Sequence, residues 1–188
     1  MDPDAYLCQL AEIFNGISVN TPSLSAIIAI ILAGLLLLAS GFASASEIAF
    51  FSLSPSDLND IEEGNHPSDG KISNLLADSE RLLATILITN NFVNVTIIML
   101  CNFFFMNVFV FHSPLAEFLI LTVILTFLLL LFGEIMPKIY SAQKTLAFCR
   151  FSAPVIYVLR KVFAPISAVL VHSTAFLNKH FAKKNHNI

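Results

Sequence analysis

The chain has 188 residues, of which 56% are hydrophobic and only 12% are charged, and its formal net charge is −3. The charged share is about half of that in ordinary soluble domains. No Lys, Arg, Asp or Glu occurs in residues 13–46, 82–116 or 118–133. Much of these stretches is apolar on every side of a helix, which excludes a water-soluble globular fold.

Three transmembrane helices are expected, in an all-α membrane protein embedded in the lipid bilayer. A bilayer core of about 30 Å requires roughly 20 apolar residues in a helix. The first span is expected at residues 23–50, the second at 81–111 and the third at 115–136. Pro114 would close the tight turn between the second and third spans.

The chain divides into three parts around these spans. Residues 1–21 are expected to form an external N-terminal segment. Residues 22–138 would form the three-helix transmembrane domain, with a cytoplasmic loop at 54–81. Residues 139–188 would follow as juxtamembrane helices and a basic cytoplasmic end.

Amphipathic helices are expected on the cytoplasmic side of the membrane. Two short ones are expected in the loop, at residues 57–63 and 72–77. In residues 140–180, apolar stretches alternate with basic residues and are interrupted by two prolines. This pattern favours helices that lie along the membrane surface with their basic side chains towards anionic lipid. A fourth span within residues 155–177 is the alternative.

The basic residues are concentrated after the third span, and only Lys71 and Arg81 precede its end. The other eight are Lys138, Lys144, Arg150, Arg160, Lys161, Lys179, Lys183 and Lys184. By the positive-inside rule the C-terminus is then cytoplasmic, and three spans place the N-terminus outside. The expected location is the inner (cytoplasmic) membrane of the cell.

Three groups of polar residues lie at membrane depth, each in the cytoplasmic half of its span. Polar side chains there are costly and usually have a partner or a function. The groups are Ser40, Ser44, Ser46 and Glu47 in the first span, Asn90, Asn91 and Asn94 in the second, and Gly133, Glu134, Pro137 and Lys138 at the end of the third. Ser40, Ser44 and Glu47 share one helix face.

Pro137 affects the backbone hydrogen bonds of the third group. It has no N–H, so in a continuing α-helix it leaves the Gly133 carbonyl, four residues back, without its usual partner. That carbonyl, the Glu134 carboxylate, serine hydroxyls and asparagine oxygens form an all-oxygen set, which suits hard cations such as Mg²⁺ and Ca²⁺. Each group also has a packing interpretation, with serine and asparagine as interhelical contacts and Glu134 paired with Lys138.

Three segments of the chain resemble those of a known family. They are residues 42–52 (FASASEIAFFS), 83–95 (LATILITNNFVNV) and 132–138 (FGEIMPK). Their order and spacing resemble the transmembrane domain of the CorC/CNNM magnesium transporters, also called the DUF21 domain. The resemblance covers roughly residues 20–180. The family usually has glycine where this chain has Thr89. The Met-Asp-Pro-Asp start and the Ser-Glu-Ile-Ala-Phe-Phe-Ser-Leu run look similar to the Bacteroidetes branch of GldE-like gliding-motility proteins.

The resemblance implies a homodimer with an inward-facing cavity that holds a largely dehydrated Mg²⁺, whose export is coupled to Na⁺ entry. It also implies that a CBS-pair domain follows in the full-length protein. The ion ligands of the family match Ser44, Asn91 or Asn94, Gly133 and Glu134 here. The remaining polar residues of the spans, Ser40, Ser46, Glu47 and Asn90, are further candidates.

The leading functional prediction is a divalent-cation transporter domain, for Mg²⁺ first, that works by alternating access. The competing hypothesis is a membrane scaffold or regulator of a gliding-motility or secretion machine that moves no ion. The sequence has no phosphate-binding loop and no nucleophile with an obvious base. We therefore expect neither an enzyme nor a nucleic-acid-binding protein.

Overall fold

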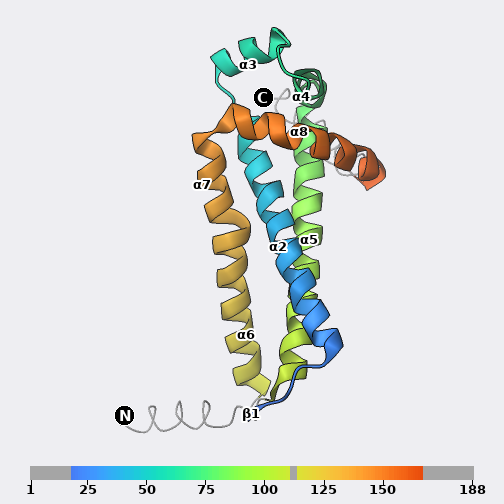
Figure 1. The fold of residues 1–188 in the computed structure, drawn as a ribbon, viewed down its shortest axis with the longest axis vertical. Helices are drawn as coiled ribbons and strands as arrows, with labels where there is room; N and C mark the ends of the chain where they lie inside the picture. Colours follow the sequence, from blue (N-terminus) through green and yellow to red (C-terminus); the bar gives the residue numbers. More distant parts are fainter. Residues whose placement is uncertain (1–17, 111–113, 167–188) are drawn as a thin grey trace, which may run out of the picture.

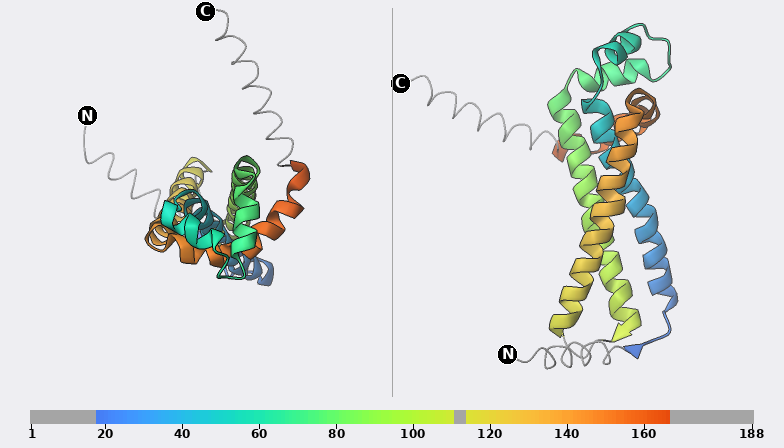
Figure 2. Two further views of the ribbon diagram at one scale, coloured as in Figure 1. Left: turned by 90° about the horizontal axis from the view of Figure 1, so that it is seen from above. Right: turned by 90° about the vertical axis from the view of Figure 1, so that its left-hand side faces the viewer.

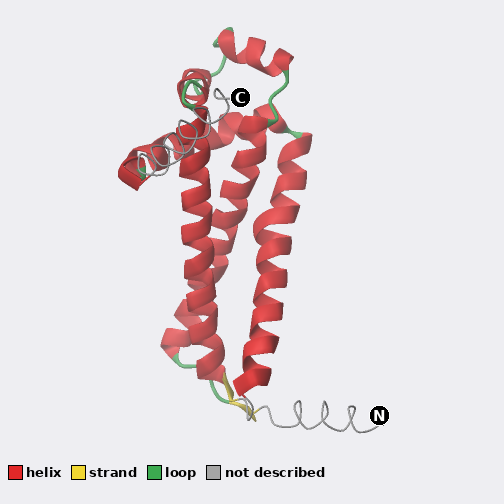
Figure 3. Ribbon diagram, turned by 180° about the vertical axis from the view of Figure 1, so that it is seen from behind, coloured by secondary structure: helices red, strands yellow, loops and turns green. Residues whose placement is uncertain are grey.

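The computed structural model of the protein describes residues 18–110 and 114–166. Three long helical segments run side by side, and shorter helices gather at one end of them (Figures 1 and 2). Helices make up nearly all of the described chain (Figure 3), which confirms the predicted all-α fold class. Most of the predicted external segment and the basic end beyond residue 166 lie outside the described residues.

The first two spanning helices are α2 (Leu24–Phe51) and α5 (Ser79–Val108). Each begins at a capping residue, Ser23 or Asp78, whose side chain accepts a hydrogen bond from a free N–H of the first turn. Both helices are long and apolar enough to cross a membrane. Their ends lie within a few residues of the predicted ones.

The third span is a continuous helix made of α6 (Pro114–Leu128), the π-helical segment η1 (Leu129–Ile135) and α7 (Met136–Gln143). It is also long and apolar enough to cross a membrane. The helix continues beyond the predicted end at residue 136. It tolerates the charge of Lys138 in this extension because carboxylates on two helices neutralise it.

α2 packs along α5, and the third span lies at the side of this pair. Ala26, Ala29 and Ala33 of α2 are buried, and such small side chains let helix backbones approach closely. In the most apolar part of the third span only 17% of the residues are buried, against 33% in each of the other two spans. The third span therefore presents most of its surface outward.

Three shorter helices, α3 (Pro55–Glu62), α4 (Asp69–Leu76) and α8 (Thr145–Val162), cap one end of the spans (Figure 1). α3 and α4 overlap the two short helices that the sequence predicts in the loop. The cap has its own apolar core, which also takes in the adjoining ends of α2 and α5. Its largest buried members are Phe50, Ile61, Ile72, Leu75, Leu82, Ile86 and Ile156.

α8 lies across the ends of the spans rather than beside them (Figures 1 and 2). Its exposed apolar residues Phe151, Val155, Val158 and Val162 recur at helical spacing along one face. α8 is not among the three described helices that could cross a membrane. The prediction of an amphipathic helix is thus confirmed over the described part of this segment, and residues 167–180 lie outside it.

A buried ion pair holds α8 to α4. Asp69 has no exposed surface, and Arg150 donates to both of its carboxylate oxygens, over 2.8 and 3.1 Å. The hydrogen bonds from Arg150 hold the pKa of Asp69 below its usual value, which burial alone would raise. The backbone N–H of His66 also donates to this carboxylate. The cap therefore depends on a carboxylate that stays ionised while buried.

At the opposite end, a two-residue ribbon joins the beginning of α2 to the end of α5. β1 (Ser18–Val19) pairs antiparallel with β2 (Phe109–Val110). The Ser23 hydroxyl also donates to the Asn107 side-chain oxygen over 2.9 Å. The sequence did not predict these strands, because two residues give no periodic signal.

We expect Asp69→Ala to destabilise the cap, because it leaves the Arg150 guanidinium without its buried partner. Breaking such a pair costs about 3 kcal/mol, which corresponds to a fall of roughly 6–12 °C in the Tm of the purified protein. Arg160→Ala is the matched control, since Arg160 bonds Asn74 at an exposed position. Equal Tm values for the two variants would contradict the structural role of the pair.

Candidate functional site

Ser40 of α2 is buried against two asparagines of α5. Its hydroxyl oxygen lies 2.9 Å from the side-chain oxygen of Asn90 and 2.6 Å from that of Asn94. A serine hydroxyl carries one proton, so it donates to one of these oxygens at a time. The other amide oxygen keeps acceptor capacity that this hydroxyl does not use.

Ser44 lies one helical turn further along the same face of α2, towards the cap. It has no exposed surface, and its hydroxyl has no hydrogen-bond partner. Two neighbouring buried serines do have partners: Ser46 donates to the Phe42 carbonyl over 2.7 Å, and Ser141 donates to the Ala45 carbonyl over 2.6 Å. Ser44 is the one buried side-chain polar group without a partner in residues 18–110 and 114–166.

An unpaired buried hydroxyl costs about 1–3 kcal/mol and calls for an explanation. Ser44 could turn its hydroxyl back to the carbonyl four residues earlier, as Thr85 and Thr89 do in α5 over 2.8 Å each. It leaves that bond unmade. An oxygen in this state is available to a ligand that enters between the helices.

The third span approaches α2 closely at two glycines. A Cβ added to Gly41 would lie 2.9 Å from Cγ of Pro137 and 3.3 Å from the Phe132 carbonyl oxygen. A Cβ added to Gly133 would lie 3.2 Å from the Ser40 hydroxyl oxygen. Gly133 therefore brings the third span to the Ser40–Asn90–Asn94 contact.

The π-helical register changes which carbonyl Pro137 leaves without a donor. The N–H of Met136 reaches back five residues to the Leu131 carbonyl. In that register Pro137 would have donated to Phe132, whereas in the α-helical register that the sequence prediction assumed it would have donated to Gly133. In this register the Phe132 carbonyl, which faces Gly41, takes the place of the Gly133 carbonyl as the one that Pro137 leaves without a donor.

Two carboxylates meet on the ammonium group of Lys138 at the end of the site nearer the cap. Lys138 Nζ lies 3.2 Å from Glu134 on its own helix and 3.4 Å from Glu47 on α2. The expected pair between Glu134 and Lys138 is therefore present. The bond to Glu47 was not predicted, although Glu47 shares the face of Ser40 and Ser44.

The structure thus brings together most, but not all, of the predicted site residues. Ser40 contacts Asn90 and Asn94 and lies beside Gly133. Ser44 lies one turn away along α2. Glu134 and Glu47 both pair with Lys138. Ser46 is satisfied within α2. Asn91 is exposed and makes no hydrogen bond within the described residues, so the Asn94 alternative is the one placed beside α2.

Sequence comparison supplies an independent finding. Residues 30–188 match the family model described as the cyclin M transmembrane N-terminal domain. A curated protein of Haemophilus influenzae, described as a "UPF0053 protein", is 32% identical over 130 residues. That alignment covers 69% of this chain and 30% of the relative, so the chain matches less than a third of the relative's length.

The closeness of α2 to the third span can be tested at Gly41. We expect Gly41→Ala to push α2 away from the Pro137 ring and to destabilise the protein by about 1–3 kcal/mol, seen as a lower Tm. Gly34→Ala is the matched control, because nothing lies within 4 Å of its added Cβ and alanine favours a helix over glycine. A Gly41→Ala variant as stable as Gly34→Ala would refute this close contact.

Proposed function

We propose that this chain, which belongs to the family of cyclin M transmembrane N-terminal domains, carries a divalent cation across the membrane, with Mg²⁺ as the first candidate. The match to this family model confirms the family resemblance seen in the sequence. The assignment to the GldE-like branch stays a prediction.

The observation that carries this proposal is the unpaired, fully buried hydroxyl of Ser44. It lies one helical turn from the place where Ser40 meets the side-chain oxygens of Asn90 and Asn94 and the backbone of Gly133, so oxygens of all three spans are nearby. Hard cations prefer such ligands, and soft metals prefer thiolate or imidazole. We call this set, together with the Glu134 carboxylate, the oxygen cluster.

The low net charge of the site suits a transported cation that binds and is then released. Glu47, Glu134 and Lys138 together carry one net negative charge, and the other ligands are neutral. The affinity of an oxygen site for Ca²⁺ or Mg²⁺ rises with the number of charged ligands. A single net charge favours weak, reversible binding over permanent retention.

The direction and setting of transport belong to the same proposal. We expect the cap of α3, α4 and α8 on the cytoplasmic face of an inner membrane, with Mg²⁺ exported and Na⁺ entering. Every Lys and Arg in the described residues lies at the cap end of the molecule (Figure 1), which supports this orientation. A CBS-pair domain would follow the chain in the full-length protein.

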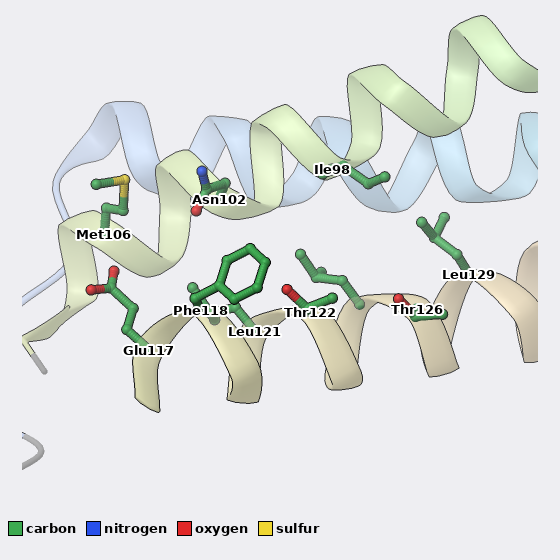
Figure 4. A pocket seen from close by; sticks show the side chains of 10 residues that line it. Ile98, Asn102, Met106, Glu117, Phe118, Leu121, Thr122, Thr126 and Leu129 are labelled. Atoms are coloured by element: carbon green, nitrogen blue, oxygen red, sulfur yellow. The ribbon is translucent and has the colours of Figure 1, made fainter. Parts of the chain in front are cut away.

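A groove between α5 and α6 supports the proposed homodimer. It has a volume of about 360 Å³, and Asn102, Thr122 and Thr126 are among the side chains that line it (Figure 4). All three side chains are exposed at membrane depth and have no hydrogen bond within the described residues. Such groups are costly against lipid, and a partner helix can satisfy them. We propose that a second copy covers this groove.

Mg²⁺ titration of the purified chain in detergent tests the cation site. We expect saturable binding to the wild type, and an affinity lowered by more than about ten-fold in Ser44→Ala, Asn94→Ala and Glu134→Ala, because each removes an oxygen ligand. Asn91→Ala should have a smaller effect, since Asn91 is exposed. Unchanged affinity in Asn94→Ala and Glu134→Ala would favour the packing interpretation and with it the non-transporting scaffold.

Cross-linking in native membranes tests the homodimer. In a chain whose Cys8, Cys101 and Cys149 are replaced, we expect Thr126→Cys to give a dimer with a bifunctional maleimide. Leu35→Cys is the control, because it places an exposed thiol on the outer face of α2. Equal cross-linking from the two positions would argue against pairing through the groove.

A further inference from the structure

Lys138 makes an ion pair that differs from the others in the described residues. The Asp69–Arg150 pair joins two cap helices, and the Asp78–Arg81 pair lies at the start of α5. The ammonium group of Lys138 instead lies between Glu47 of the first span and Glu134 of the third. It therefore links two membrane-spanning helices at the cap end of the oxygen cluster.

Helix geometry and helix packing together hold Lys138 between Glu134 and Glu47. Glu134 and Lys138 are four residues apart, which places them on one helix face. The contact of Gly41 with Pro137, the residue before Lys138, holds α2 against the same helix. Without the lysine, the two carboxylates would face each other at partly buried positions, where one carboxylate raises the free energy of ionising the other.

We propose that Lys138 is a tethered counterion that competes with the transported cation for Glu134. When a divalent cation enters the oxygen cluster, the ammonium releases Glu134 and keeps its contact with Glu47. When the cation leaves, the ammonium returns to Glu134. This inference rests on the proposed function, because it needs Glu134 to be a ligand of the cation.

The chemistry of lysine suits this exchange. Its ammonium is a compact charge with three donors on a flexible four-carbon stem, so it can leave one carboxylate without leaving the other. Arginine at this position would hold carboxylates through a rigid two-pronged fork. Each carboxylate keeps a cationic neighbour in both states, so neither is left as an unpaired charge in a site of low polarity.

A competing Lys138 weakens the binding of the cation, whereas a lysine that only stabilises the site would strengthen it. We expect Lys138→Met to lower the Kd for Mg²⁺ by at least about ten-fold, because it removes a positive charge that competes directly with the ion. Lys138→Arg should bind Mg²⁺ no more tightly than the wild type. Glu47→Gln should raise the Kd, because Lys138 is then left with Glu134 alone.

The experiment is Mg²⁺ titration of the wild type and the three variants, with the Mg²⁺-induced rise in Tm as a second readout. The Lys138→Met variant can be unstable without the ion, and titration alone would then be hard to interpret. Tighter binding of Mg²⁺ would still give this variant a larger Mg²⁺-induced rise in Tm than the wild type. Wild-type binding with a tighter Lys138→Met variant supports the inference. Wild-type binding with an equal or weaker Lys138→Met variant overturns it and leaves the proposed function standing, whereas no wild-type binding removes both.

Discussion

The close approach of α2 to the third span is the constraint on which the rest of the site depends. Two residues without side chains, Gly41 and Gly133, let the helices meet at distances where a Cβ would crowd Pro137 or Ser40. This approach places backbone carbonyls of the π-helical segment beside the serine face of α2. With bulkier residues at these positions, the polar groups of the three spans would be separated by side chains.

The polar residues of the three spans form two levels along α2. At one level Ser40 lies between two asparagines, and nearer the cap Glu47 shares the ammonium of Lys138 with Glu134. Ser44 lies between these levels and has no partner. Packing alone explains the Ser40 level, because a hydroxyl between two amides is effective interhelical bonding. Packing does not explain a buried hydroxyl that leaves a local hydrogen bond unmade, and this hydroxyl is the reason for the cation site that we propose.

Much of the fold could be predicted from the sequence, because the absence of charge over some twenty residues is a strong signal in a bilayer. The spacing of Ser40, Ser44 and Glu47 also predicted that they share one face of the first span. The sequence could not select Asn94 over Asn91, since that choice depends on the rotation of α5 against α2. It missed the π-helical register, which moves the carbonyl affected by Pro137 to Phe132. It also missed the bond between Glu47 and Lys138, because no local spacing relates residues on different helices.

The proposed divalent-cation site lies around the unpaired hydroxyl of Ser44, and locating the bound ion tests this proposal. The measurement is a crystal structure of the protein grown with Mn²⁺, a stand-in for Mg²⁺ with strong anomalous scattering. We expect an anomalous peak within coordinating distance of the Ser44 hydroxyl and the Glu134 carboxylate, with Lys138 moved towards Glu47. A peak confined to the outer surface, with Ser44 still unpaired and Lys138 still on Glu134, would contradict it.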